Sequence, residues 1–489
     1  MSKNLVLCFE GTSAGFGNPP PSNIIKLFSM LDQNTQTCYY QPGIGTTFGG
    51  AVPDIESSTH FKYGLDSIKN SLDAAFALSF ESHVQAAYLF LMRFWTPKSK
   101  VYIFGFSRGG YTARVLIGFL ECFGLFHQGS EMLVPLAWRV YSGWEKAGRP
   151  RRDPTSSFSL HLRRLFGQEI RVQFLGIWDT VSSVGILTDR LFPFTTCSSI
   201  VDHIRHAQSI DERRAKYRQV PFYVDDHTSD RAVPSLLQRI WIWANSLWFS
   251  NHSDTNVSKD ILEMWFPGSH GDMGGSWGLD ENGKRLSEVP FRWLIAEGCK
   301  FGVQLGKDSI ESYWERYQPK DSLLSYQHDN LSLRRSKVQE QEIFEGADGV
   351  ILRCNGRGNS SFLKSIWWWF LELIPFNTKI AKGNGRWTNK FSPNLGKNRV
   401  IPPNAQLHWS VFYRLALVDD YRPNNLPPRL GTYIVKSVEE TGVSLTEDES
   451  ASLEALDMES IRTTNLEHIW KRVPDELAHQ TGYESMSTA

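Results

Sequence analysis

Short runs of β-branched, aliphatic and aromatic residues alternate with helical patterns through the first 300 residues of the chain. These runs predict strands at residues 4–9, 37–41, 100–105, 171–178 and 261–266. Strands that alternate with helices are typical of a mainly parallel sheet with helices packed on its faces. The predicted fold class is therefore α/β.

Two segments carry the periodicity of helices. Residues 64–95 form a long helical pattern that Pro97 ends. After Tyr111, apolar or small residues recur at the spacing of one helical face, at Val115, Gly118, Phe119 and Cys122. A helix is therefore expected directly after the strand at 100–105, and a polar, proline-containing connection is expected at 146–157.

The pattern divides the chain into three parts. Residues 1–310 are expected to form the α/β domain, interrupted at 225–260 by an inserted helical lid. The lid has an apolar helical face made of Leu236, Ile240, Trp243, Leu247 and Trp248. Residues 311–435 predict an α-rich or mixed C-terminal extension packed on that domain. Residues 436–489 predict an acidic, partly mobile tail, because 439–459 contain eight acidic residues and no basic one.

The most apolar segment of the extension is FLKSIWWWFLELIPF at 362–376, which is too short to span a bilayer. Its apolar helical face comprises Phe362, Ile366, Trp369, Phe370 and Leu373, and Lys364, Ser365 and Glu372 lie opposite. Such a helix can pack on the core, lie in a lipid interface or close over an acyl-binding groove. We favour packing on the core.

Composition narrows the class of protein. Apolar residues make up 41% and charged residues 21%, as in ordinary globular proteins. The 52 basic residues balance the 52 acidic ones, so nucleic acid is not an expected partner. Seventeen tryptophans indicate an apolar ligand groove, a peripheral membrane contact or an aromatic-rich core.

The N-terminal sequence and the cysteines bear on localisation. The six cysteines form no CxxC pair, which suggests neither a zinc site nor a disulfide framework. The N-terminus, MSKNLVLCFEGT, does not resemble a signal peptide. A cytoplasmic location is expected, and export would need another route.

The pattern Gly-x-Ser-x-Gly occurs twice, around Ser13 and around Ser107. A nucleophile elbow requires a strand, a sharp turn with small residues and then a helix. Ser107 meets this requirement, because VYIFG precedes it and the periodic helix follows. Ser13 instead leads into GFGNPPPSN, whose prolines forbid an immediate helix. Ser107 is therefore the candidate nucleophile.

A serine hydroxyl needs a base, and the base needs an acid to orient it. Asp179, at the end of the run 171–178, is the candidate acid. His270, in the glycine-rich loop after the strand at 261–266, is the candidate base. Asp272 is an alternative partner for that ring, and His408 is a rival base that on its sequence pattern is a packing residue.

The remaining candidate residues would stabilise the oxyanion and hold the substrate. Backbone N–H groups of Arg108, next to the nucleophile, and of Gly11 and Thr12, in the loop after the first strand, are the expected oxyanion donors. The alternative is that the loop with Gly11 and Thr12 is an ordinary glycine turn without a catalytic role. Phe106 beside the nucleophile and the lid residues Trp243 and Trp248 are the candidate substrate contacts.

Eight motifs in order carry a family resemblance: FEGTSAG, NIIKLF, YYQPGIGT, GFSRGGYTAR, GIWDTVSSVG, RHAQSIDERR, WFPGSHGDMGG and LSEVPFRWL. They resemble the α/β-hydrolase family that includes the type VI secretion phospholipase effectors and uncharacterised fungal proteins, over residues 3–300. The resemblance implies hydrolysis of phospholipid acyl esters by a triad whose matching positions are Ser107, Asp179 and His270. One departure is Glu10, where the family usually has aspartate.

Three functions follow as hypotheses. The first is a cofactor-independent serine ester hydrolase acting on a lipid-like or other hydrophobic ester. The second is a metal-dependent phosphohydrolase with Glu10, Asp179, His270 and Asp272 as ligands, since oxygen-rich sets suit hard metal ions. The third is a catalytically silent binding protein on a hydrolase scaffold.

Overall fold

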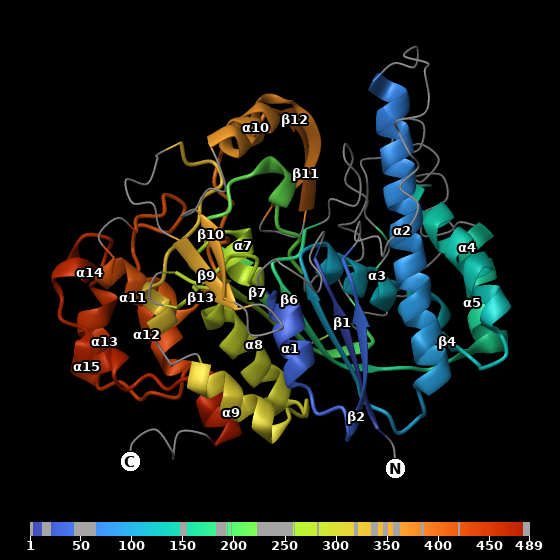
Figure 1. Cartoon of the computed structure of the whole chain (residues 1–489), viewed down its shortest axis with the longest axis horizontal. Coiled ribbons are helices and arrows are strands. Elements are labelled where there is room, and N and C mark those ends of the chain that lie inside the picture. Colours follow the sequence, from blue (N-terminus) through green and yellow to red (C-terminus); the bar gives the residue numbers. More distant parts are fainter. Residues whose placement is uncertain are drawn as a thin grey trace, which may run out of the picture.

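The computed structural model of the chain has 489 residues and describes most of them (Figure 1). The described residues are 3–11, 21–43, 65–146, 154–181, 192, 194–196, 198–222, 258, 260–280, 283–316, 321–333, 341–345, 351–355, 362–382, 386–418 and 421–482. The predicted lid at 225–260 falls outside them except for residues 258 and 260. Thr12 and Ser13 also lie outside the described residues.

A seven-stranded parallel sheet forms the centre of the molecule, in the order β13-β8-β7-β6-β3-β1-β2. Five of its strands lie within one residue of the predicted bounds: β1 (Asn4–Phe9), β2 (Gln36–Gln41), β3 (Val101–Phe106), β6 (Val172–Trp178) and β8 (Asp260–Phe266). The predicted α/β class, a mainly parallel sheet flanked by helices, is confirmed.

Two strands of the sheet were not predicted, β7 (Val201–Ser209) and the short β13 (Gln406–Leu407). β7 is central but polar, because His203, Arg205 and His206 lie within it. Their charged partners come from elsewhere in the fold: Asp260 for His203 and Arg205, Glu297 also for Arg205, and Glu263 for His206. Ion pairs between residues that are distant in sequence cannot be predicted from a hydrophobic pattern.

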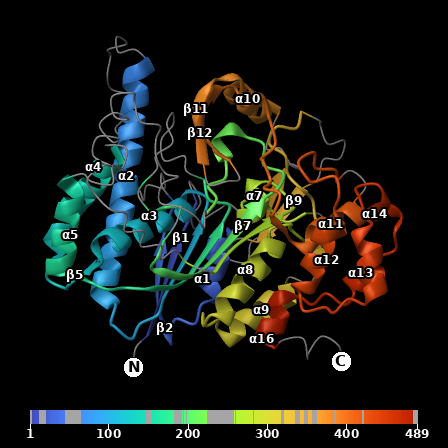
Figure 2. The same ribbon diagram turned by 180° about the vertical axis from the view of Figure 1, so that it is seen from behind.

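The two faces of the sheet bury separate cores. Along β1, Val6 and Cys8 pack on one side, and Leu5, Leu7 and Phe9 pack on the other. The first core is covered by α1 (Asn23–Met30) and α8 (Glu288–Lys300). The second is covered by α2 (Leu65–Phe94) and α3 (Arg108–Phe123), with α4 (Val134–Lys146) and α5 (Pro154–Phe166) packed outside them (Figures 1 and 2). The connection expected at 146–157 lies between α4 and α5, and α5 begins within its last residues.

The region after residue 306 adds helices and three short pieces of sheet. Its elements are α9 (Lys307–Arg316), the antiparallel pair β9 (Gln341–Glu345) and β10 (Ile351–Asn355), α10 (Phe362–Leu373), the hairpin of β11 (Phe376–Lys382) and β12 (Arg386–Ser392), α11 (Trp409–Leu417) and α12 (Gly431–Glu439). In Figure 1, α10 and this hairpin lie above the end of the sheet that carries α7. Its last strand, β13, joins the central sheet beside β8.

The acidic tail expected at 436–489 is instead folded onto the domain as far as residue 482. It forms α13 (Glu447–Glu454), α14 (Ser460–Thr463), α15 (Glu467–Trp470) and α16 (Glu476–Thr481). Leu453, Ile461, Trp470 and Leu477 are buried in the same core as α8. The prediction of a mobile segment was wrong there. It rested on the acidic residues alone, whereas the apolar residues spaced between them pack the segment onto the core.

The order and connections of the strands indicate where a ligand site is expected. β1 lies between β2 and β3, so the chain leaves β1 toward one edge of the sheet and later returns on its other side. In parallel α/β sheets, ligands bind at the carboxyl ends of the strands beside such a reversal. Glu10 follows β1 there, and Ser107 follows β3.

Among the described residues, none of the helices combines the length and the apolar character needed to cross a bilayer.

Candidate active site

Ser107 occupies the single-residue turn between β3 and α3. Its φ of 57° and ψ of −123° lie in a region that side-chain-bearing residues rarely adopt. Such a conformation costs on the order of 1–3 kcal/mol and persists only where its surroundings enforce it. Its N–H donates to the carbonyl oxygen of Trp178 at 3.0 Å. The turn therefore has the strained geometry of a nucleophile elbow.

Two glycines make room for this turn. A Cβ on Gly109 would lie 2.3 Å from the carbonyl oxygen of Phe9, and one on Gly105 would lie 2.7 Å from the Cα of Gly110. Both obstacles are backbone atoms, which cannot rotate away as a side chain can. The first and last residues of the GFSRG motif are therefore required by close packing of β1, β3 and α3.

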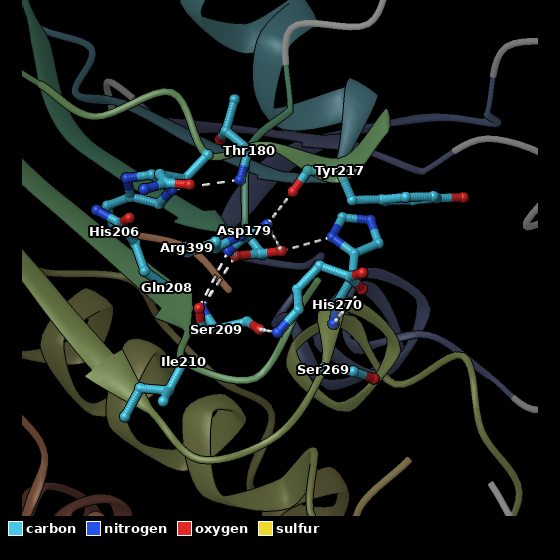
Figure 3. Close-up of polar contacts among 12 residues, drawn as sticks. Asp179, Thr180, His206, Gln208, Ser209, Ile210, Tyr217, Ser269, His270 and Arg399 are labelled. Carbon is cyan, nitrogen blue, oxygen red and sulfur yellow. Dashed lines mark hydrogen bonds and ion pairs between the residues drawn. The ribbon is translucent and has the colours of Figure 1, made fainter. Parts of the chain in front are cut away.

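The structure brings the three predicted side chains together. The Nε2 of His270 lies 2.8 Å from the Oγ of Ser107, and its Nδ1 lies 2.6 Å from the Oδ2 of Asp179. Figure 3 shows the second of these contacts. With the proton on Nδ1, the ring donates to the carboxylate and Nε2 accepts from the serine hydroxyl. The arrangement is competent to move a proton off Ser107.

Asp179 is fully buried, and its carboxylate has donors on both oxygens. Oδ1 accepts from the N–H of Ser209 at 3.0 Å, and Arg399 donates to both oxygens, with 2.9 Å between Nη2 and Oδ2 (Figure 3). Burial alone would raise the pKa of Asp179, but Arg399 and His270 together hold that pKa below its ordinary value. The carboxylate is therefore ionised wherever the protein is folded near neutral pH.

His270 begins the short helix α7 (His270–Gly274) and is fixed through its backbone and its ring. Its N–H donates to the Oε2 of Glu212 at 3.2 Å, and Glu212 is itself held by Arg214. The ring lies between those of Phe106 and Tyr217, with centroids 4.9 and 4.6 Å away. Burial lowers the pKa of His270, and Asp179 opposes this only in part. The neutral ring can therefore accept a proton near pH 7.

The alternative partners for these groups are engaged elsewhere. Asp272 accepts from the N–H of Ser269 at 2.9 Å and lies 2.7 Å from the Nδ1 of His328, so it does not orient His270. His408 lies between Glu476 and Ser410, where it caps α11. Among the described residues, no three His, Cys, Asp or Glu side chains are arranged to hold a metal ion. The metal-ligand set of the second hypothesis is therefore not assembled.

The three predicted oxyanion donors, Gly11, Thr12 and Arg108, have different surroundings in the structure. The N–H of Gly11 donates to the Oε1 of Glu10 at 2.7 Å, so it is committed to its own loop. Gly11 instead permits close approach, since a Cβ there would lie 2.9 Å from the ring of Phe106 and 3.4 Å from the Cβ of Ser107. Arg108 is the first residue of α3, so its N–H belongs to the helix N-terminus that faces the elbow. Thr12 lies outside the described residues.

Glu10 is buried and also accepts a hydrogen bond from the hydroxyl of Ser22, the N-cap of α1. Burial raises the pKa of Glu10 to about 7, against the effect of its hydrogen bonds with Ser22 and Gly11. The Glu10 side chain thus ties the loop after β1 to the start of α1. Its hydrogen bonds are with Gly11 of its own loop and with Ser22 at the start of α1.

The predicted substrate contacts are Phe106, Trp243 and Trp248. Phe106 is buried and supports the ring of His270, so the structure places it in the core beneath the site. Trp243 and Trp248 lie outside the described residues. Sequence reasoning missed Arg399, Tyr217 and Glu212. The motif RHAQSIDERR contains Glu212 and was a usable signal, whereas nothing in the sequence pointed to Arg399.

The family comparison is consistent with this geometry. The model described as "T6SS, Phospholipase effector Tle1-like, catalytic domain" matches residues 3–297. The chain is also 32% identical over 556 residues to the uncharacterized protein YEL023C of Saccharomyces cerevisiae, covering 87% of this chain and 80% of that protein.

Two solved structures are more distant, each with 14% sequence identity. One is an uncharacterized protein from Pseudomonas aeruginosa, with a TM-score of 0.33 over 98% of this chain and 63% of that one. The other is the Tle1 effector bound to the VgrG spike of the Type 6 secretion system, with a TM-score of 0.25 over 57% of this chain and 52% of that one. The chain thus spans less than two thirds of either solved chain. Because the family match at residues 3–297 extends over more than half of the sequence, the protein belongs to the family of Tle1-like phospholipase effector catalytic domains.

Proposed function

We propose that the protein is a serine ester hydrolase that cleaves a lipid-like carboxylic ester, such as a phospholipid, through an acyl-enzyme. The observation that carries this proposal is the unbroken line of contacts from Ser107 through His270 to Asp179, at 2.8 and 2.6 Å. The strained turn at Ser107 adds independent support, because a structural serine has no need of it. The lipid-like substrate rests on membership of a family described by its phospholipase effectors.

In the acylation step, the Oγ of Ser107 forms a bond to the ester carbonyl carbon as its proton passes to the Nε2 of His270. Asp179 stabilises the imidazolium that results. The carbonyl oxygen becomes an oxyanion, for which the N–H of Arg108 is the candidate donor. When this tetrahedral intermediate collapses, the bond to the leaving alcohol breaks, and the alcohol takes the proton from Nε2.

In the deacylation step, water gives a proton to the Nε2 of His270 while its oxygen forms a bond to the acyl carbon. Collapse of the second intermediate breaks the bond to Ser107, whose Oγ takes the proton back from Nε2. The products of this step are a carboxylic acid and the regenerated enzyme, and the proton transfers need only Ser107, His270, Asp179 and water.

We also propose that the protein binds a lipid surface through α10 and takes its substrate from that surface. The sequence pattern favours packing of its apolar face on the core, but Ile366, Phe370 and Leu373 are exposed, and so is Trp367. The opposite face, with Ser365 and Glu372, is buried. Glu372 accepts from the N–H of Ala215 at 2.6 Å, in the segment that continues to Tyr217. The polar face thus holds the helix beside the site. Ile366, Phe370 and Leu373 face outward, as in helices that lie in lipid interfaces, whereas Trp369 is half-buried and donates to the carbonyl oxygen of Leu331 at 2.8 Å.

Hydrolysis of a defined phospholipid tests the catalytic proposal. Wild-type protein is expected to release fatty acid, Ser107→Ala is expected to lose at least about 1,000-fold of this activity, and EDTA is expected to change neither result. Thr112→Ser, which removes a methyl group and keeps the buried hydroxyl on α3 outside the relay, is the matched control. Full activity in Ser107→Ala would refute the proposal. Loss of fatty-acid release with EDTA would favour a metal-dependent mechanism, and an inactive wild type would favour the silent scaffold.

Binding to phospholipid vesicles tests the role of α10. The double substitution Ile366→Ser with Phe370→Ser removes two exposed apolar side chains and is expected to weaken sedimentation with vesicles by at least about tenfold, from roughly 25 cal/mol for each Å² of apolar surface withdrawn from water. Leu165→Ser is the control, since Leu165 is an even more exposed apolar residue but lies on α5. Hydrolysis of a soluble ester should be unchanged in both variants. Equal loss of vesicle binding in both would contradict a specific role for α10.

A further inference from the structure

Arg399 lies beyond the family-matched residues 3–297, yet its side chain reaches the centre of the site. It follows β12 in a segment attached to the loop after β7. The Nδ2 of Asn394 donates to the carbonyl oxygen of Arg213 at 2.7 Å, and Gln219 donates to that of Val400 at 3.2 Å. Asn425 donates to the carbonyl oxygens of both Arg399 and Ile210, at 3.1 and 3.0 Å. These bonds fix the backbone from which the guanidinium extends.

The guanidinium joins three segments around Asp179 (Figure 3). Nη1 donates to Oδ1 of Asp179 and, at 3.2 Å, to the carbonyl oxygen of Ser209. Nη2 donates to Oδ2 of Asp179 at 2.9 Å and to the carbonyl oxygen of Tyr217. The side chain is buried. A planar fork that holds both carboxylate oxygens sets the plane of the carboxylate as well as its position.

This contact acts on the same oxygen that His270 uses. Oδ2 of Asp179 accepts from Nδ1 of His270 at 2.6 Å and from Arg399 at once. With its plane fixed, the carboxylate can hold only one tautomer of the ring in line with Ser107. The positive charge of Arg399 also offsets part of the negative charge that would otherwise favour a protonated imidazole.

We propose that Arg399 is a positioning residue of the active site, through which the C-terminal region completes the relay begun by residues 3–297. The inference rests on the proposed serine mechanism. It predicts two separate effects of Arg399. The planar fork of the guanidinium supports kcat, and the positive charge of the guanidinium sets the pH at which His270 becomes active as a base. Other charged or titratable groups also face the pair of Asp179 and His270 from neighbouring elements: Glu212, Arg214, Tyr217 and His206.

The test measures kcat and KM against pH for a water-soluble short-chain ester, together with thermal unfolding. Arg399→Gln removes charge and fork. It is expected to lower kcat by about 10- to 100-fold with KM unchanged, and to move the acid limb of kcat/KM upward by about one pH unit. Arg399→Lys keeps the charge without the fork, so kcat is expected to fall while the acid limb stays in place.

The matched control is Arg414→Gln. Arg414 is also a buried arginine of the C-terminal region, but it donates to the carbonyl oxygens of Leu323 and Ser325. Its loss should lower the melting temperature and leave the acid limb in place. Wild-type kcat in Arg399→Lys would overturn the inference, even if Arg399→Gln fails to fold. An acid limb shared by folded Arg399→Gln and wild type would also overturn it. If Ser107→Ala is as active as wild type, the serine mechanism itself has failed, which is a separate result.

Discussion

Replacing Asp179 by asparagine should damage both catalysis and stability, for reasons that the contacts of its carboxylate make explicit. The two oxygens accept four hydrogen bonds, from Ser209, His270 and twice from Arg399. An asparagine amide can present an oxygen at only one of the two positions. At the other, its NH₂ group would face two donors, whichever way the amide is turned.

The expected magnitudes follow from these contacts. Loss of the acceptor for Nδ1 frees the imidazole to adopt the wrong tautomer, which should lower kcat by about 10,000-fold, or about 5 kcal/mol of transition-state stabilisation. Arg399 would be left as a buried charge without its counter-ion, which should cost about 3–5 kcal/mol of unfolding free energy. Both quantities are measurable on the purified full chain, by ester turnover and by urea unfolding.

The stability difference should depend on pH with a defined sign. Because the pKa of Asp179 is lowered in the folded protein, its contribution is complete above the unfolded-state pKa of about 3.9 and is lost as pH falls through the lower folded value. The part of the stability difference that comes from ionisation of Asp179 should therefore be constant from pH 5 to 7 and should fall only below about pH 4.

Asp260→Asn is the control for this prediction. Asp260 also lies 2.6 Å from the Nδ1 of a histidine, His203, and accepts two bonds from Arg205, but it begins β8 at the opposite end of the sheet. Its partly exposed carboxylate should affect stability by no more than about 1 kcal/mol and leave kcat unchanged. Asp179→Asn with kcat within tenfold of wild type would refute the reasoning.

Two further predictions concern the base and the elbow. The acid limb of kcat/KM should lie below pH 6.5, because burial lowers the pKa of His270 from that ordinary value; a pH–rate profile with its acid limb above 7 would contradict the assignment of His270 as a buried neutral base. Gly109→Ala should lower both turnover and melting temperature, because the added Cβ meets backbone oxygens of Phe9 and Glu10 at 2.3 and 2.5 Å. Gly143→Ala, in α4 with nothing within 4 Å, should leave turnover unchanged and stabilise the protein by about 0.5–1 kcal/mol; equal effects of the two substitutions would count against a tightly packed elbow.

The parts of the fold that sequence reasoning found are those with local signals. β1, β3 and β6 are short apolar runs, and Ser107 stands between such a run and a periodic helix, so hydrophobicity and spacing were sufficient. Asp179 and His270 could be proposed because each follows a predicted strand. Their contact with Ser107 required the order of the strands in space, which only the structure supplies.

The parts that escaped prediction depend on distant partners. β7 is central because its polar side chains find ion pairs on β8 and α8. α10 appeared suited to the core, yet it buries Glu372, because the N–H of Ala215 and the amide of Asn394 meet that carboxylate. Arg399 belongs to the site only because its segment folds back on residues 210–219. The cytoplasmic location stays a prediction.

The central claim is that His270 activates Ser107, and covalent labelling tests it most directly. Treatment of the full chain with a fluorophosphonate, followed by peptide mass spectrometry, should add one phosphonyl group to Ser107 in wild type. His270→Ala should react at least about 100-fold more slowly, as expected when a general base is removed. Labelling at a different residue, or an undiminished rate at Ser107 in His270→Ala, would contradict the account.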